Sequence, residues 1–93
     1  MKYLLFTLFM ILVRCGLAQE QSKFEGYLDN SLLNYSNRNY TKAIVYYDSI
    51  ISIRPKLHLA YLSRGKSYIF INKIEKGIAD LEHAVKYKLL RRV

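Results

Sequence analysis

The sequence predicts an all-α fold of short amphipathic helices that follow an apolar N-terminal segment. Apolar residues recur at helical spacing from residue 24 to residue 92. No stretch of useful length shows the alternation of apolar and polar residues that is typical of a strand. That stretch holds one proline, Pro55, and no glycine- or serine-rich linker. The length of 93 residues allows one domain. It excludes a TIM barrel, a complete dinucleotide-binding fold and any two-domain enzyme.

The segment 1–18 has the three parts of a secretory signal peptide. Met1-Lys2 is a positive start, residues 3–13 are an unbroken apolar run, and Gly16-Leu17-Ala18 supplies small residues for cleavage. A membrane-spanning helix needs about 20 apolar residues, so this run is too short to anchor the chain. We expect cleavage after Ala18, a short linker over residues 19–23, and export to the periplasm, the cell surface or the medium. A buried N-terminal helix is the alternative interpretation.

Cys15 raises the question of a lipid-modified cysteine. Lipoprotein signals resemble L-x-[GA]-C, but the residue before Cys15 is the large, charged Arg14, which argues against lipidation. Cleavage after Ala18 removes the only cysteine of the chain. Disulfides, thiolate catalysis and cysteine-based zinc sites are then excluded for the mature form.

The remaining chain predicts four helices, each with one apolar face. Asn37 and Asn39 suit a turn after the first helix, because Asn tolerates the left-handed conformation and caps helix starts. Pro55 disfavours a helical Arg54 and is placed in the start of the third helix. Asn72 predicts a similar turn between the third and fourth helices. The expected helices cover residues 25–36, 40–53, 57–71 and 74–90.

The chain also resembles itself when Tyr27 is aligned with Tyr61. Small residues then coincide at two positions, where they would let helices approach closely. A helix–turn–helix period of about 34 residues, which this alignment gives, is typical of one repeat family. The further pairs that coincide are Leu28 with Leu62, Ser31 with Gly65, Lys42 with Lys76, Ala43 with Gly77, and Ile44 with Ile78.

The motifs resemble those of the tetratricopeptide repeat (TPR) family. The family pattern opens W-x2-L-G-x2-Y, and Tyr61-x2-Arg64-Gly65-x2-Tyr68 matches it with Tyr for Trp and Arg for Leu. The A-x3-F pair corresponds to Ala43-x3-Tyr47, with Pro55 at the family's distance. The resemblance implies two antiparallel helix–turn–helix repeats, residues 24–57 and 58–93, stacked as a short right-handed α-solenoid. A generic four-helix bundle is the alternative.

Two departures from the family pattern shape further expectations. Asn30 and Asn34 stand where Leu and Tyr belong, which suggests a one-residue-shorter turn before Tyr40. The second repeat has Leu89 in place of the closing proline.

The TPR resemblance implies a concave groove for an extended or helical peptide. The expected groove is mostly apolar with one cation, which suits an amphipathic helix or an aliphatic peptide. Packing within the stack is the alternative role of the apolar members. The groove candidates are Leu28, Leu32 and Tyr35 from the first repeat and Leu62, Lys66, Ile69 and Phe70 from the second.

We expect the outer face of the last helix to be buried against another surface, because two repeats supply only a small core. Val85, Leu89 and Leu90 are candidates for self-association. A second copy, a partner protein, or additional chain in a longer relative could each provide that surface.

Neither the net charge nor the spacing of the polar residues suggests an enzyme. The net charge is +8, and we assign the C-terminal cations to a solvated helix end, with an anionic membrane surface as a weaker alternative. We expect no nucleic-acid partner, no cofactor and no metal. His58 and His83 lack metal-ligand spacing, and the acids are expected singly on the surface, with Asp80–His83 an ordinary helix pair. The predicted function is an exported, non-enzymatic adaptor or scaffold that binds a protein or peptide, with a self-assembling structural unit as the alternative.

Overall fold

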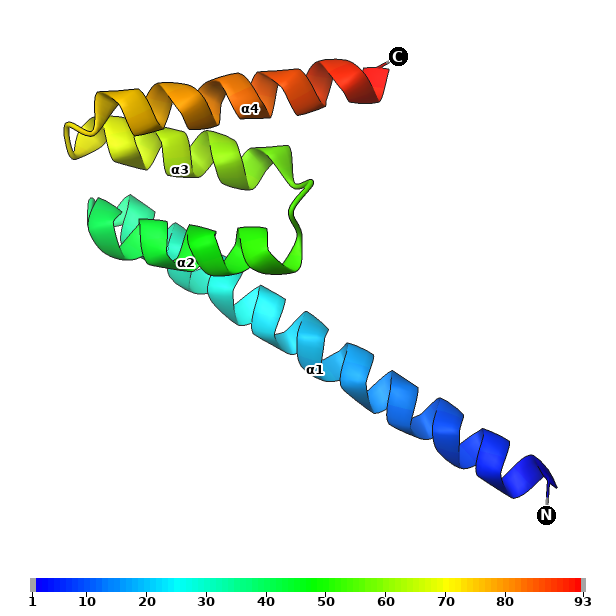
Figure 1. Cartoon of the computed structure of the whole chain (residues 1–93). Helices are drawn as coiled ribbons and strands as arrows, with labels where there is room; N and C mark the ends of the chain where they lie inside the picture. The colour runs from blue at the N-terminus through cyan, green and yellow to red at the C-terminus, as the bar shows by residue number, and fades with distance from the viewer. Residues whose placement is uncertain (1, 93) are drawn as a thin grey trace.

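The computed structural model describes the backbone of residues 2–92, and the side chains of that range except those of residues 87 and 89–92. Over this range the chain is all-helical, as predicted, and contains no strand. Consecutive helices pack on one another in chain order (Figure 1). The helices are α1 (Lys2–Ser36), α2 (Tyr40–Ile53), α3 (His58–Phe70) and α4 (Ile74–Arg92).

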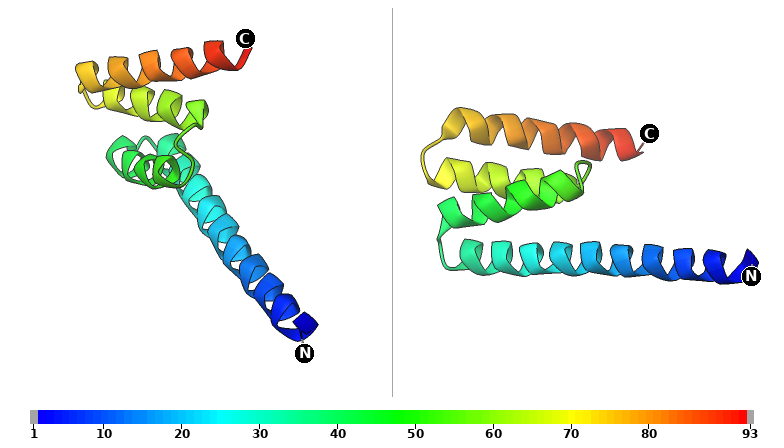
Figure 2. Two further views of the ribbon diagram at one scale, coloured as in Figure 1. Left: turned by 45° about the vertical axis from the view of Figure 1, so that its right-hand side comes forward. Right: turned by 60° about the horizontal axis from the view of Figure 1, so that its bottom comes forward.

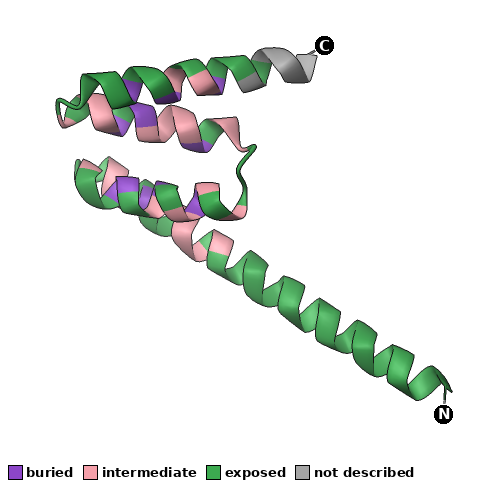
Figure 3. Ribbon diagram, in the orientation of Figure 1, coloured by how far each residue is buried: buried purple, intermediate pink, exposed green. Residues whose placement is uncertain are grey.

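Helix α1 differs most from its expectation. It ends at Ser36 as predicted, but it is one 35-residue helix that includes the expected signal segment and the expected linker 19–23. No proline interrupts residues 2–36, so no residue in that range forces a break. Residues 2–20 are all exposed and project away from the other helices (Figure 3). The packed part of α1 begins near Gln21, whose side-chain oxygen accepts a hydrogen bond from Arg54 at 3.0 Å.

Helix α2 is central to the core. Each helix runs antiparallel to the next, so α1 and α3 flank α2 and run in the same direction (Figure 2). Tyr47 and Ile50 of α2 are buried together with Ala43 and with Ala60 of α3. Apolar side chains of α1 and of the α2–α3 turn surround this cluster, and Ile51 joins them from α2; they are Phe24, Tyr27, Leu28, Tyr35 and Leu57.

Small residues mark both hairpin crossings, as expected from the sequence. In the second hairpin, a Cβ added to Gly65 would lie 2.9 Å from the Gly77 carbonyl oxygen, and one added to Gly77 would lie 2.8 Å from the Gly65 carbonyl oxygen. In the first hairpin, the equivalent residues Ser31 and Ala43 are fully buried. The small side chains therefore permit the close helix contact that larger ones would prevent.

The two hairpin turns have the same backbone geometry at equivalent positions of the sequence repeat. Arg38 and Asn72 are the left-handed residues, with φ of 63° and 68°. Four backbone hydrogen bonds of the first turn recur in the second; three keep the same length, and the other is 3.0 Å in the first turn and 3.2 Å in the second. They are Asn37 N to Leu33 O, Arg38 N to Tyr35 O, Asn39 N to Asn34 O, and Ala43 N to Asn39 O, which correspond to bonds from Ile71, Asn72, Lys73 and Gly77.

This geometry corrects two expectations about the first turn. The expected one-residue-shorter turn is wrong, because residues 37–39 and 71–73 separate their helices equally. The left-handed residue is Arg38 and not a neighbouring Asn. Asn39 does precede α2, but its side chain makes no capping hydrogen bond.

The connection from α2 to α3 also differs from its expectation in detail. Arg54 ends α2 with a non-helical φ of −129°, as the following proline predicts. Pro55, however, lies in the turn and not in the first turn of α3, which begins at His58. The Tyr61 hydroxyl donates a hydrogen bond to the Pro55 carbonyl oxygen at 3.1 Å, which ties the turn to α3.

Candidate functional site

An apolar groove of about 360 Å³ lies between α1 and α3, with α2 as its floor. The parallel course of α1 and α3 across α2 creates it. Leu32 and Leu59 form opposite walls and are 57% and 56% exposed, so the groove is open to solvent. Its lining residues are Phe24, Leu28 and Leu32 of α1, Tyr47 and Ile50 of α2, Leu57 before α3, and Leu59, Ala60 and Ser63 of α3.

The groove candidates that the sequence placed on α1 line the groove only in part. Leu28 and Leu32 line the groove, but Tyr35 does not. The ring of Tyr35 lies edge-on to Tyr40, with centroids 5.5 Å apart, and Phe70 stacks on Tyr40 at 4.6 Å. These three aromatic residues pack next to the hairpin turns.

The α3 candidates Leu62, Lys66 and Ile69 are not among the lining residues either. Ile69 packs toward α4, where its Cγ1 lies 2.5 Å from the position that a Gly77 Cβ would take. Leu62 is half-buried. Lys66 is exposed and lies three residues after Ser63, on the same face of α3 and toward the hairpin turns. A cation is therefore near the end of the groove and not within it.

The lining residues of α3 that the sequence analysis missed are Leu59, Ala60 and Ser63. Leu59 and Ser63 are spaced i, i+4 and continue at i+7 to Lys66 and at i+11 to Phe70, which is a helical face. Helix α3 carries apolar residues on several faces, because it contacts both α2 and α4. Periodicity alone therefore did not identify the face toward α1.

Tyr47 supplies a polar group to the floor of the groove. Its side chain is only 4% exposed. Burial raises the pKa of the Tyr47 hydroxyl, and hydrogen bonding to the Ser63 hydroxyl opposes this rise. The phenol therefore remains neutral at ordinary pH and links the α2 floor to the α3 wall.

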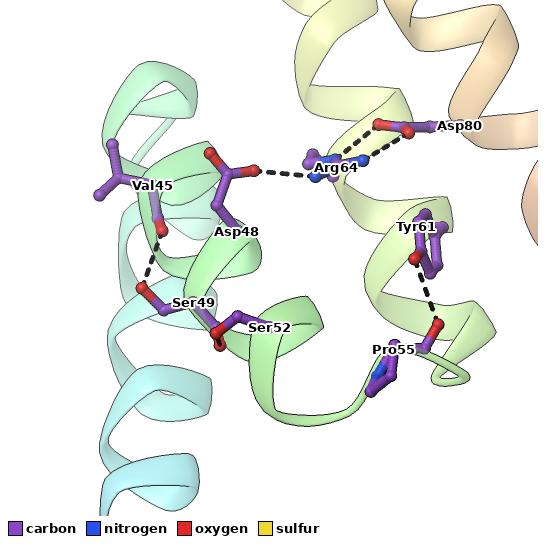
Figure 4. A network of polar contacts seen from close by, with 8 residues as sticks. All are labelled: Val45, Asp48, Ser49, Ser52, Pro55, Tyr61, Arg64 and Asp80. Carbon is purple, nitrogen blue, oxygen red and sulfur yellow. Dashed lines mark hydrogen bonds and ion pairs between the residues drawn. The ribbon is translucent and has the colours of Figure 1, made fainter.

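A buried ion pair holds α3 to α4. Arg64 Nε and Nη2 donate to the two carboxylate oxygens of Asp80, each at 2.8 Å, and Nη1 donates to Asp48 at 2.9 Å (Figure 4). The hydrogen bonds to Asp80 raise the pKa of Arg64. Asp80 is 7% exposed, so the expectation that all acids lie singly on the surface is wrong. His83 lies against the Tyr61 ring, with centroids 3.9 Å apart.

Helix α4 exposes apolar side chains next to charged ones. Of the self-association candidates, Val85 is 55% exposed, whereas the side chains of Leu89 and Leu90 lie outside the described residues. Ile74 and Ile78 continue the same face and are 43% and 46% exposed.

Metal ligands do not gather in the described part of the chain. No group of three or more His, Cys, Asp and Glu residues there could hold a metal ion. The ion pairs that the structure shows in that part join Arg64 to two carboxylates and contribute to packing.

By its length and composition, helix α1 could cross a membrane, and a signal sequence near the N-terminus passes the same test.

Comparison of the chain with protein-family models, with curated proteins and with solved structures gives no match.

Proposed function

We propose that this protein is an exported, non-enzymatic interaction module of TPR type that holds an apolar peptide in the groove between α1 and α3. The observation that carries the repeat assignment is the recurrence of the turn hydrogen bonds, and of the left-handed residues Arg38 and Asn72, at equivalent positions of the two hairpins. The close contact of Gly65 with Gly77 and the burial of Ser31 and Ala43 support it.

The groove chemistry defines the ligand class. Leucine and phenylalanine side chains form the walls, so affinity would come from burial of aliphatic or aromatic side chains, at about 25 cal/mol per Å². The half-buried Ser63 offers a polar contact to a peptide backbone, whereas the Tyr47 hydroxyl is buried beneath it and neutral, so it adds no charge to the floor. Lys66 near the groove end favours an acidic residue on one side of the ligand. These features fit an amphipathic helix with apolar residues at i, i+3 and i+4.

Selection from a displayed library of random peptides on the full chain would test the groove. We expect the enriched peptides to share an apolar helical face, and Leu32→Glu or Leu59→Glu to weaken their binding by about tenfold or more, measured by fluorescence polarisation. Leu33→Glu is the matched control, because Leu33 is 58% exposed on the same helix and does not line the groove. Equal loss in all three variants would contradict the proposal.

Export is proposed on a separate observation. Residues 2–20 are exposed, and the core contacts of α1 come from Phe24 onward. Cleavage after Ala18 therefore leaves the packed part of the helix and the Arg54–Gln21 hydrogen bond intact. Intact-mass measurement of the exported protein should give a chain that starts at Gln19, and Ala18→Arg should block processing. An unprocessed wild-type chain in the export fraction would contradict this.

A further inference from the structure

The outward face of α4 carries a continuous apolar stripe. Ile74, Ile78, Leu81 and Val85 follow one another at intervals of three or four residues, which places them on one helix face. A hollow on this face is lined by Ile78, Leu81, Val85, Glu82 and Lys86. The adjacent face of α4, which carries Gly77 and Asp80, packs on α3, and the half-buried Leu81 lies between that face and the stripe. The stripe is therefore a second apolar surface, separate from the groove.

Charges beside the stripe indicate what covers it. Glu75 and Lys86 are about three helical turns apart and so lie on the same flank of the stripe. Both are exposed, and within the described residues neither forms an ion pair. An acid at one end of this flank and a base at the other complement a second copy of the flank when the two helices run antiparallel. Glu82 lies between them on the same flank, so it meets its own copy near the centre of such a pair and opposes the attraction in part.

We propose that α4 pairs with α4 of a second copy of this chain, antiparallel, about a two-fold axis near Leu81. Ile78 then packs near the partner's Val85, and Glu75 meets the partner's Lys86, with each contact formed twice. A parallel pair would leave Glu75 and the partner's Lys86 about 16 Å apart along the axis. The pairing does not use the groove, so its failure leaves the groove proposal untouched.

Charge exchange tests the antiparallel arrangement. The full chain, in mild non-ionic detergent, is measured by sedimentation velocity over a concentration series. Glu75→Lys and Lys86→Glu should each weaken the dimer by about tenfold, because both place like charges opposite each other, and the double variant should restore it. Single variants that do not change the dimer, or a double variant as weak as the singles, would overturn the proposal.

Disruption of the stripe tests the face itself. Val85→Glu should leave a monomer over the same concentrations. Val45→Glu is the matched control, because Val45 is 58% exposed on α2. Circular dichroism should show that Val85→Glu keeps the helical spectrum of the wild-type chain, which separates lost association from lost folding. A wild-type chain that stays monomeric at about 100 µM, or equal effects of both variants, would overturn the proposal.

Cysteine cross-linking locates the axis. In a Cys15→Ser background, Leu81→Cys should form an intermolecular disulfide, because the axis brings the two copies of this position together. Val85→Cys should not, since the partner's equivalent position lies about 12 Å away along the helix. Cross-linking of both variants would indicate a parallel pair, and cross-linking of neither would indicate no pair; either result overturns the proposal.

Discussion

The guanidinium of Arg64 in α3 donates two parallel hydrogen bonds of 2.8 Å to the carboxylate of Asp80 in α4. The side chains are 20% and 10% exposed, so this pair lies largely out of water. The third contact of Arg64 reaches Asp48 in α2, so one side chain connects three helices (Figure 4). Two of these helices belong to the second hairpin and one to the first, so Arg64 links the two proposed repeats.

Removal of the cation should be costly. Arg64→Leu leaves Asp80 buried without its partner and should lower the free energy of unfolding by about 2–3 kcal/mol, measured by urea denaturation. Asp48→Asn should cost less than about 0.5 kcal/mol, because Asp48 is 53% exposed and its pairing is screened by water. The double variant Arg64→Leu/Asp80→Leu should recover most of the loss. An Arg64→Leu variant as stable as wild type would contradict this account.

Filling the glycine contact should separate α3 from α4. Gly65→Ala places a Cβ 2.9 Å from the Gly77 carbonyl oxygen and 3.0 Å from Asp80 Cβ. Overpacking should exceed the gain of about 1 kcal/mol in helix propensity, so the thermal midpoint should fall. Gly26→Ala is the control, because a Cβ there meets nothing within 4 Å, and this variant should be more stable than wild type. Equal changes in both variants would show that the close contact is unimportant.

The strained turn offers a route to stabilisation. Arg38 adopts a φ of 63°, which costs a side chain with a Cβ about 1 kcal/mol relative to glycine. Arg38→Gly should raise the free energy of unfolding by about 0.5–1 kcal/mol, and Arg38→Asn by less, as measured by denaturant titration. Asn72→Ala, at the equivalent position of the second turn, should have the opposite effect. A destabilised Arg38→Gly variant would mean that the Arg38 side chain makes a contribution larger than the strain.

Alkaline pH should weaken the fold through Tyr47. Its pKa in the unfolded chain is near 10.0, and burial raises the pKa in the native state. Between these two values the unfolded chain releases the proton and the native chain keeps it, so stability falls as pH rises above about 10. Thermal midpoints at a series of pH values should show this decline, and Tyr47→Phe should flatten it. An unchanged slope in Tyr47→Phe would assign the decline to other groups.

Local patterns predicted the helices and the hairpin crossings well. Helices α2, α3 and α4 begin and end within two residues of expectation, and α1 ends where expected, because Pro55 and the Asn residues act on their own neighbourhood. The small residues at 31, 43, 65 and 77 were recognised because the repeat aligned them. The helix ends are encoded within a few residues of each boundary, whereas the small residues became recognisable only through the comparison of the two repeats.

Tertiary relationships were harder to predict. The pairing of Arg64 with Asp80 depends on the rotation of α3 against α4, and spacing along one helix could not reveal it. The groove wall on α3 was misassigned because Leu59, Leu62 and Ile69 are apolar on different faces. The left-handed residue of the first turn was placed on an Asn, although backbone position and not residue type selected Arg38.

The unbroken course of α1 has a mechanical consequence. From residue 2 to residue 20 the helix forms a rigid rod of about 28 Å, joined without a hinge to the part that walls the groove. If residues 2–20 entered a bilayer, an uncut chain would therefore hold the proposed binding groove at a fixed height and tilt above it, whereas a single peptidase cut would release the groove from the membrane.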